Sequence, residues 1–348
     1  MLVRRAAALA AVFVVSTLLV VAPPAAAYSK PGTCRNHSLT VALIEGAPKE
    51  HTLAATLCLP QVWAPGEHQV DLLVAGGSYN RMYWDWPTNP AVYSYVDHTL
   101  AAGRATLSFD RLGSGASSRP AASDLTSSVG AFVIHQLVDW LHSQGYSEVN
   151  GIGHSLGSVI LTDEASRWQD LDRVVLTGLL HLPGIGKDIG GLATSMYPAF
   201  LDPRFAGEIT DPGFLTTIPG KRGTSFYDQR TADPEIIAAD ERSKDVFSIA
   251  AAVEGLPVVV APPALNPSRT ITAPVLSVIG AEDGIFCNLA VNCHSADDVR
   301  DNEAPYYPNA ADFDTIVVPR TSHNLALHPS GPQTFQQIDA WIETGNVD

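Results

Sequence analysis

The chain of 348 residues is long enough for one large domain or two ordinary ones. Hydrophobic residues make up 46% of it and charged residues 16%, which indicates a globular protein with a large core and excludes a disordered one. The net charge of −15 argues against binding to nucleic acid, which requires basic surfaces. The sequence has no H-E-x-x-H motif, and no G-x-G-x-x-G follows an expected strand, so we expect no metal and no cofactor.

Residues 1–27 have the features of a secretory signal peptide. Arg4 and Arg5 precede an uncharged run, Ala6 to Ala22, and the segment ends in an A-x-A site at Ala27. Removal of these residues would change the net charge from −15 to −17, because they contain two arginines and no acid. An uncleaved anchor helix is the alternative, since 17 residues just reach the lower limit for spanning a bilayer. The A-x-A site favours cleavage before Tyr28, and we expect a secreted protein with no stable membrane span.

Export by the twin-arginine route is disfavoured, because the residues that usually flank the arginine pair are missing. An exported chain with four cysteines is expected to form two disulfides, for which three pairings exist. Short separations favour Cys34–Cys58 and Cys287–Cys293. Metal binding by Cys287, Cys293 and the adjacent His294 is an alternative, but an oxidising compartment favours the disulfide.

Strands and helices alternate along most of the chain. The expected strands are residues 39–44, 51–59, 70–75, 104–109, 148–153, 173–177, 275–280 and 313–318. The expected helices are residues 91–103, 124–145, 156 to about 168, about 295–303 and 334–344. The helix over 124–145 is the clearest, since apolar residues recur every three or four positions, Asp124 can cap it and Gly145 can end it. This alternation predicts a mostly parallel sheet with helices on both faces, which binds ligands at the carboxyl ends of its strands.

The interval 181–269 interrupts the alternation. It is rich in glycine, proline and aromatic residues, and includes an acidic helix-like stretch, Pro234 to Lys244. A structureless loop of this length is improbable in a compact domain. We therefore expect an inserted cap or lid, with the core formed by residues 28–180 and 270–348.

The motif G-x-S-x-G stands between an expected strand and an expected helix. It reads Gly153-His154-Ser155-Leu156-Gly157, and its glycines permit a crowded turn with the serine at its apex. A serine hydroxyl is a weak nucleophile by itself. The interpretation therefore requires a histidine base, a carboxylate to orient it, and an oxyanion hole.

With these elements in this order, the chain resembles the α/β-hydrolase superfamily over nearly all residues after the signal segment. Members of that fold carry nucleophile, acid and histidine in that chain order, each after a strand. The resemblance implies Ser155 as nucleophile, Asp283 as acid and His323 as base. His323 would take the serine proton and return it to the leaving group, while Asp283 would fix the imidazole tautomer. Glu282 and His328 are the alternatives for acid and base.

The resemblance also implies an oxyanion hole made of two backbone N–H groups. These belong to Leu156, which follows the nucleophile, and to Gly77, in the loop after the strand 70–75. Ser78 is the near alternative, because Ala75 stands where relatives often have a histidine and the register is less secure.

Three further features lie near the expected site. The aromatic run Tyr83-Trp84-Asp85-Trp86 suits an apolar substrate pocket lined by Trp84 and Trp86, and equally suits packing against the cap. The stretch Asp110 to Ser117 resembles the D-x-x-G-x-G-x-S turn of the superfamily, which we interpret as structural support. His154 is interpreted as a packing residue, and a Cys287–Cys293 disulfide would rigidify the loop of Asp283.

These inferences predict a secreted serine hydrolase that cleaves a carboxylic ester or lactone through an acyl-enzyme. The substrate would be a small, hydrophobic ester. A serine nucleophile argues against haloalkane dehalogenases and epoxide hydrolases, which use aspartate in this superfamily. Amidase or peptidase activity and acyl transfer remain alternatives, a carrier-dependent thioesterase is disfavoured by export, and a non-catalytic binding protein belongs to a different class.

Overall fold

The computed structural model describes residues 28–65, 68–182 and 189–347. The expected signal segment, residues 1–27, lies outside them, as do residues 183–188 of the expected insertion. Of the described residues, 31–347 belong to one compact unit, which carries the fold, and 28–30 do not belong to it. Among the helices of the described ranges, none has the length and apolar character needed to cross a membrane.

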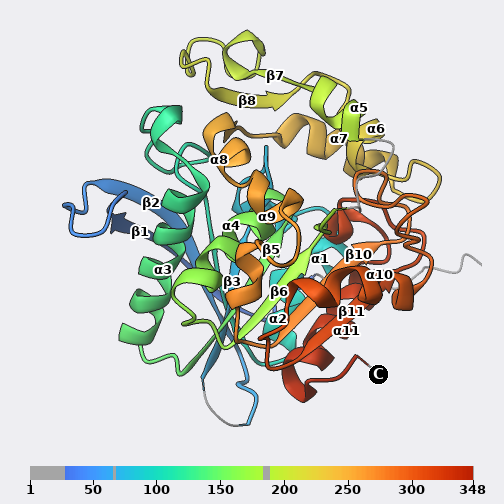
Figure 1. Ribbon diagram of the computed structural model, residues 1–348. Coiled ribbons are helices and arrows are strands. Elements are labelled where there is room, and N and C mark those ends of the chain that lie inside the picture. The colour runs from blue at the N-terminus through green and yellow to red at the C-terminus, as the bar shows by residue number, and fades with distance from the viewer. Residues whose placement is uncertain (1–27, 66–67, 183–188, 348) are drawn as a thin grey trace, which may run out of the picture. The chain divides into compact units, whose positions relative to one another are not determined.

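An eight-stranded sheet forms the centre of this unit (Figure 1), with strand order β1-β2-β4-β3-β5-β6-β10-β11. The strands are β1 Gly32–Val41, β2 His51–Pro60, β3 Gln69–Val74, β4 Ala105–Phe109, β5 Glu148–His154, β6 Arg173–Thr177, β10 Val275–Gly280 and β11 Phe313–Val318. The six strands from β4 to β11 run parallel, whereas β2 is antiparallel to both β1 and β4. The carboxyl ends of the six parallel strands therefore meet at one edge.

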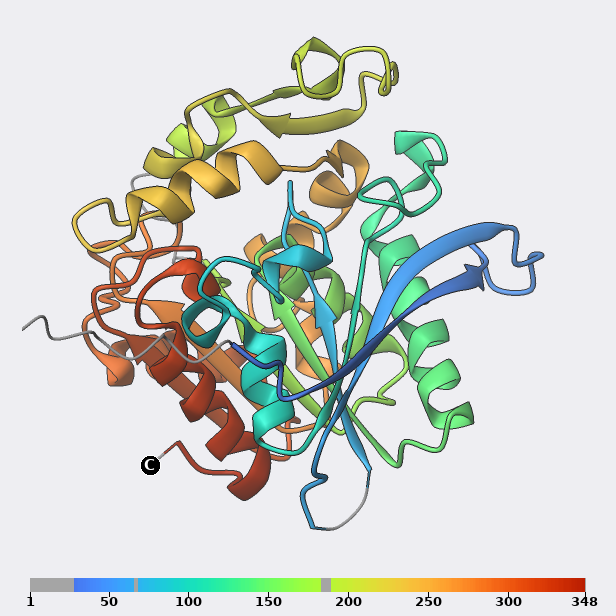
Figure 2. The same ribbon diagram turned by 180° about the vertical axis from the view of Figure 1, so that it is seen from behind.

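Helices cover both faces of the sheet (Figures 1 and 2). They are α1 Pro90–Tyr93, α2 Tyr95–Ala101, α3 Ser127–Ser143, α4 Leu156–Arg167, α10 Ala296–Glu303 and α11 Gly331–Thr344. Each face of the sheet packs on its own set of helices, as two neighbouring residues of β3 illustrate. Leu72 packs in the apolar cluster that includes α3 and α4, and Leu73 packs in the cluster that includes α2 and α11. Successive side chains of a strand point to opposite faces, so a strand buried on both faces is a continuous apolar run. The predicted α/β architecture is confirmed.

Several helix boundaries differ from those expected, and two of these differences have a clear physical reason. Helix α3 begins at Ser127, and the side chain of Thr126 accepts a hydrogen bond from the Val129 amide. Asp124 lies in a short 3-10 turn before it, so the expected cap was wrong. The expected helix over 91–103 is divided at Ser94, whose extended backbone and hydroxyl cap start a second helix.

Residues 189–269 are hereafter called the inserted segment. Most of them form a second, smaller assembly at one end of the large sheet, whereas residues 249–260 pack beside α3 and α4 (Figures 1 and 2). Its antiparallel sheet contains β7 Met196–Pro198, β8 Phe214–Thr217 and β9 Phe247–Ser248. Its helices are α5 Ile189–Thr194, α6 Arg222–Phe226, α7 Pro234–Ser243, α8 Ile249–Glu254 and α9 Leu256–Val260. Arg222 donates a hydrogen bond to Ser78, in the loop after β3, so the segment packs on the carboxyl edge of the parallel strands.

Both cysteine pairs are joined as expected. Cys34 and Cys58 are directly opposite in the β1–β2 ladder and are bonded to each other. Cys287 is bonded to Cys293 in the loop after β10. The alternative of a metal site at Cys287 and Cys293 is therefore wrong, because the bond consumes both thiols.

Candidate active site

Ser155 occupies the sharp turn between β5 and α4. Its backbone angles are φ 53° and ψ −119°, a conformation that side-chain-bearing residues rarely adopt. A Cβ added at Gly157 would lie 2.2 Å from the Val74 carbonyl oxygen, and one at Gly153 would lie 2.7 Å from the Ser158 Cα. Only glycine fits at both positions, which explains how the motif permits this turn.

Two further side chains complete a chain of contacts with the serine. The Nε2 atom of His323 lies 2.9 Å from the Ser155 hydroxyl oxygen. The Nδ1 atom of the same ring lies 2.9 Å from a carboxylate oxygen of Asp283. His323 is 2% exposed and Asp283 is fully buried. Because Asp283 follows β10 and His323 follows β11, parallel strands bring all three residues to the same edge of the sheet.

Asp283 is held by its own loop. Its second carboxylate oxygen accepts a hydrogen bond from the Ile285 amide at 2.9 Å, and its carbonyl accepts one from the Cys287 amide. The amide of Asp283 donates to the Gly280 carbonyl. These contacts leave one carboxylate oxygen for the imidazole and fix its direction.

The two alternative residues have other partners. Glu282 forms an ion pair with Arg230 at 2.8 Å on the surface. His328 is buried and donates from Nδ1 to the Asn324 carbonyl. Its Nε2 accepts hydrogen bonds from the amides of Ser322 and Asp228, and burial lowers its pKa, so it remains neutral.

His154 lies next to His323 but is not one of the three residues joined by these contacts. Its ring stacks on Tyr83 at 4.5 Å between centroids and lies 5.0 Å from the ring of His323. The Thr177 hydroxyl donates to the Gly153 carbonyl, so it accepts the Nδ1 proton of His154. Burial and then the proximity of His323 lower the pKa of His154 well below its usual value. The residue stays neutral and adds no charge that would oppose protonation of His323.

The loop 75–79 places Gly77 beside the start of α4. A Cβ added at Gly76 would lie 3.2 Å from the Ser155 Cβ, and one at Gly77 would lie 3.6 Å from a methyl group of Leu156. Leu156 is the first residue of α4, where N–H groups have no acceptor within the helix. The two backbone donors expected for the oxyanion hole thus lie near the serine, and their role stays a prediction.

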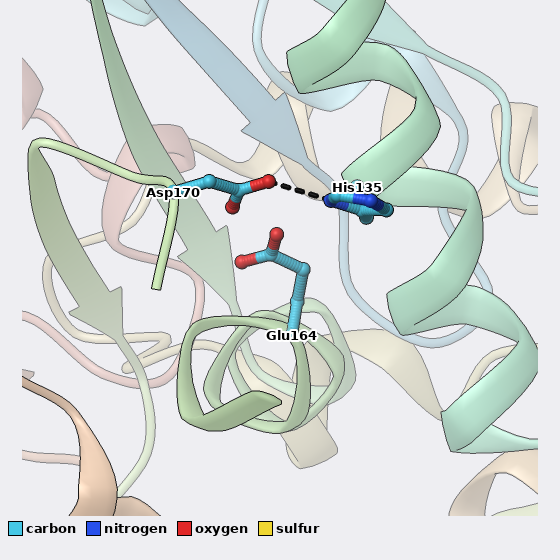
Figure 3. Close-up of side chains that lie close together, drawn as sticks. All are labelled: His135, Glu164 and Asp170. Carbon is cyan, nitrogen blue, oxygen red and sulfur yellow. Dashed lines mark hydrogen bonds and ion pairs between the residues drawn. The ribbon is translucent and has the colours of Figure 1, made fainter. Parts of the chain in front are cut away.

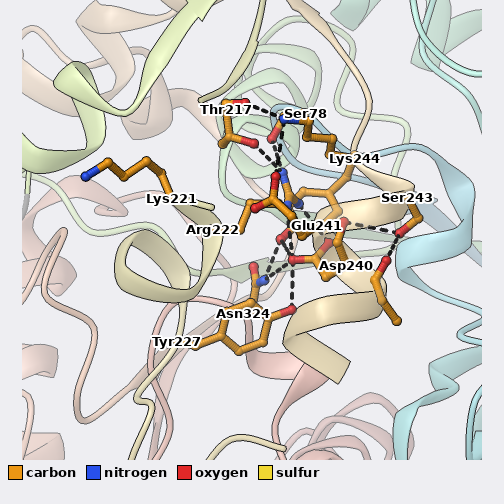
Figure 4. A network of polar contacts seen from close by, with 12 residues as sticks. Ser78, Thr217, Lys221, Arg222, Tyr227, Asp240, Glu241, Ser243, Lys244 and Asn324 are labelled. Carbon is orange, nitrogen blue, oxygen red and sulfur yellow. Dashed lines mark hydrogen bonds and ion pairs between the residues drawn. The ribbon is translucent and has the colours of Figure 1, made fainter. Parts of the chain in front are cut away.

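A fully buried ion pair connects the inserted segment to this loop (Figure 4). Arg222 of α6 donates from Nε and Nη2 to both carboxylate oxygens of Asp240 in α7, each at 2.9 Å. Its Nη1 donates to the hydroxyl of Ser78 at 2.8 Å. Ser78 itself has φ 59°, so a buried arginine fixes a residue in an unfavourable backbone conformation.

The same carboxylate extends the network to the residue after His323. The hydroxyl groups of Tyr79 and Tyr227 donate to Asp240 at 3.0 and 2.8 Å. The side chain of Asn324 donates to the Tyr79 hydroxyl. Sequence reasoning missed this network, because nothing in the local pattern links Arg222 and Asp240 to positions 78, 79 and 324.

The remaining features occupy supporting positions. Trp84 and Trp86 are each 2% exposed, and Trp84 packs edge-on against Tyr95. This burial favours the packing interpretation over a substrate pocket. Asp110 accepts hydrogen bonds from the amides of Arg81 and Ala116, as expected of a turn with a structural role.

The chain matches one protein family model and the fold of several solved structures. The alpha/beta hydrolase family model matches residues 72–334. No curated protein sequence matches the chain. Among solved structures, a thermophilic esterase from Thermogutta terrifontis has 16% identity and a TM-score of 0.57, over 89% of this chain and 98% of that one.

Two other solved structures show a similar fold. A thermostable carboxyl esterase from Bacillus coagulans has 14% identity and a TM-score of 0.58, over 90% of this chain and 99% of that one. An alpha/beta hydrolase fold protein from Chitinophaga pinensis has 14% identity and a TM-score of 0.53, over 91% and 100%. At these identities the likeness concerns the fold alone.

Proposed function

Because the chain belongs to the alpha/beta hydrolase family, we propose that it is a secreted serine hydrolase that cleaves a carboxylic ester or lactone. The observation that carries this proposal is the chain of contacts from the partly exposed Ser155 through His323 to the buried Asp283, with 2.9 Å at each step. Serine, imidazole and carboxylate in this order make a hydroxyl nucleophilic.

The proposed reaction has two halves. His323 Nε2 takes the Ser155 proton as the serine oxygen bonds to the ester carbonyl carbon, and the N–H groups of Gly77 and Leu156 receive the resulting oxyanion. Collapse of this intermediate breaks the bond to the alcohol, which leaves with the proton from His323. Water, deprotonated by His323, then attacks the acyl-serine and releases the acid, and the proton returns to Ser155.

An uncharged, apolar acyl or alcohol group suits the surroundings of the serine. Phe226 and Phe286 flank the ring of His323 at 5.7 and 6.1 Å between centroids. A Cβ added at Gly77 would touch Phe247 of the inserted segment at 3.5 Å. Aromatic walls favour hydrophobic esters, and we assign the inserted segment, with residues 181–188, the role of a cap over the substrate.

A peptidase is the second candidate, and two observations count against it. A peptidase that recognises a free amine usually needs an acidic anchor, for which Asp228, Asp233 and the exposed Glu235 are candidates. Asp228 is paired with Arg230 at 2.8 Å, and Asp233 accepts from the Glu235 amide as the cap of α7. Both carboxylates are thus already used within the inserted segment. Acyl transfer to an alcohol would use the same serine. It differs from hydrolysis in its product, which is a new ester and not the free acid.

A substrate panel tests the proposal. The secreted protein should hydrolyse nitrophenyl esters of increasing chain length with saturation kinetics and leave aminoacyl nitroanilides uncleaved. Ser155→Ala should abolish this activity, and the matched control Ser158→Ala, which replaces the first serine of α4, should retain it. Faster cleavage of anilides would favour the peptidase, and full ester hydrolysis by Ser155→Ala would refute the proposed nucleophile.

A further inference from the structure

A second cluster of polar side chains lies between α3, α4 and the turn before β6 (Figure 3). His135 of α3, Glu164 of α4 and Asp170 of the turn before β6 each offer one nitrogen or oxygen ligand atom, and these atoms lie within 4.8 Å of one another. Ser155 and Glu164 are nine residues apart along α4, which corresponds to roughly 13 Å of helix. The proposed hydrolytic reaction does not use this cluster.

Glu164 is the unusual member. Its side chain is fully buried and points into the cluster (Figure 3). Within the described ranges neither of its carboxylate oxygens has a hydrogen-bond partner, and one oxygen of Asp170 also has none. A buried carboxylate without donors is costly, and such groups normally have a partner. Burial, followed by the neighbouring Asp170, raises the pKa of Glu164.

His135 is oriented as a ligand would be. Its Nδ1 lies 2.5 Å from Asp170, on the side of the cluster. Its Nε2 faces Asp139 at 3.8 Å, and the ring stacks on Trp168 at 4.8 Å between centroids with an 11° tilt. Metal-binding histidines regularly have a carboxylate behind the second ring nitrogen, which fixes the tautomer. Asp139 has this place here, but it is 70% exposed and lies beyond hydrogen-bond distance, so the stacking on Trp168 is the firmer restraint on the ring.

We propose that His135, Glu164 and Asp170 bind a divalent transition metal ion of the zinc class. Two carboxylates neutralise the double charge of such an ion, and the imidazole favours zinc over calcium and magnesium, which prefer oxygen ligands. The side chains of His135 and Asp170 are 22% and 23% exposed, so the ion reaches the site from solvent and keeps water in its remaining positions.

The ion has a structural role in this proposal. It joins α3, α4 and the turn that leads into β6, and so fixes the helix whose first residue follows Ser155. A competing arrangement has Glu164 protonated against Asp170, with His135 and Asp170 as an ion pair. The first arrangement holds a metal ion and the second holds a proton on Glu164, and the fold is the same in both.

Metal content and thermal unfolding distinguish them. The protein, freed of metal with a chelator, is dialysed against Zn²⁺ and, in parallel, against Co²⁺ for its visible absorption. We expect one ion per chain, and a rise in Tm of about 5 °C at a hundredfold excess over Kd. Glu164→Gln, which preserves the side-chain size, should lose both effects. His135→Gln, at a partly exposed position, repeats the test if the buried variant does not fold.

The matched control is His294→Gln. It removes an exposed imidazole 3.9 Å from Glu282, and it should retain the zinc and the shift in Tm. Absence of bound zinc in the wild type, or equal binding by Glu164→Gln, would overturn the proposal. Loss of binding in His294→Gln alone would overturn it as well. An infrared band of a protonated carboxyl group that persists with zinc present and vanishes in Glu164→Gln would support the competing arrangement.

Discussion

The parallel strands and the inserted segment contribute different things to the candidate active site. Ser155, Asp283 and His323 all follow strands of the large sheet, where buried neighbours on both faces restrict their movement. The inserted segment contributes none of these three groups, but it supplies Arg222 and Asp240, which hold the loop 75–79. In the proposed reaction the sheet would carry the reacting groups, and the inserted segment would position the loop 75–79 and form part of the aromatic surroundings.

The largest loss of activity is expected for Asp283→Asn, which changes a residue that follows a strand of the large sheet. The amide would favour the wrong tautomer of His323, so kcat should fall about 10⁴-fold with little change in KM. Steady-state kinetics with the preferred ester measure this. Glu282→Gln is the control, because its partner Arg230 is on the surface, and its kcat should remain within about twofold of the wild type. A tenth or more of the wild-type kcat in Asp283→Asn would contradict the assignment of the acid.

A smaller loss of activity is expected for Asp240→Asn, a substitution in the inserted segment. It leaves the charge of buried Arg222 without its partner, which should lower the free energy of unfolding by about 3–5 kcal/mol. The loop 75–79 loses its support, so kcat should fall about 10- to 100-fold. Denaturant unfolding and kinetics below the transition measure both.

The control for that substitution is Asp233→Asn, which keeps an acceptor at the cap of α7 and should change neither quantity much. A destabilised Asp240→Asn protein with unchanged kcat would show that the segment does not position the loop.

Removal of the Cys287–Cys293 disulfide should have an effect of only a few-fold on kcat. The loop of Asp283 would be less rigid, but the Ile285 amide would still hold the carboxylate. Replacement of both cysteines by alanine, followed by activity at temperatures below unfolding, measures it. Removal of Cys34 and Cys58, at the far edge of the sheet, should lower stability and leave kcat unchanged. Unaltered turnover without Cys287 and Cys293 would refute the role of that disulfide.

The last effect concerns pH, and it acts on stability and not on kcat. Burial lowers the pKa of both His154 and His328, so the unfolded chain takes up their protons first as the pH falls below about 6.5. The stabilisation is complete above that pH and is lost below it, by at most about 1.4 kcal/mol per pH unit for each histidine. Denaturant unfolding from pH 7.5 to 5 measures this slope.

His328 is the histidine that joins the two regions, since it accepts hydrogen bonds from Asp228 of the inserted segment and from Ser322 after β11. His328→Gln should therefore reduce the slope between pH 6.5 and 5. Stability that does not change with pH in the wild type would contradict the neutral state of both residues.

Sequence patterns located the sheet well where strands are buried on both faces. The strands at 173–177, 275–280 and 313–318 have the expected bounds, because runs rich in valine, leucine and isoleucine are followed by glycine, alanine or proline. Strand β1 begins at Gly32, seven residues before the expected start, since most of its first half is exposed and gives no apolar alternation. Burial produces the pattern, so exposed strands are hard to detect.

The contacts of the inserted segment were not predictable from the sequence. Arg222 and Asp240 are far in sequence from Ser78 and Tyr79, and only tertiary packing brings them together. The cluster at Glu164 was missed for the same reason, because its three side chains have no motif spacing. The G-x-S-x-G turn was predicted because steric demands on glycine are local.

The most direct test of the central claim is labelling with a fluorophosphonate probe, followed by peptide mass spectrometry. We predict one adduct per chain, on Ser155 and not on the neighbouring Ser158, with fragment ions that separate the two. The adduct should be absent in Ser155→Ala and form much more slowly in Asp283→Asn. A folded, ester-hydrolysing protein that carries no adduct, or carries it on another residue, would contradict the assignment of Ser155 as the nucleophile.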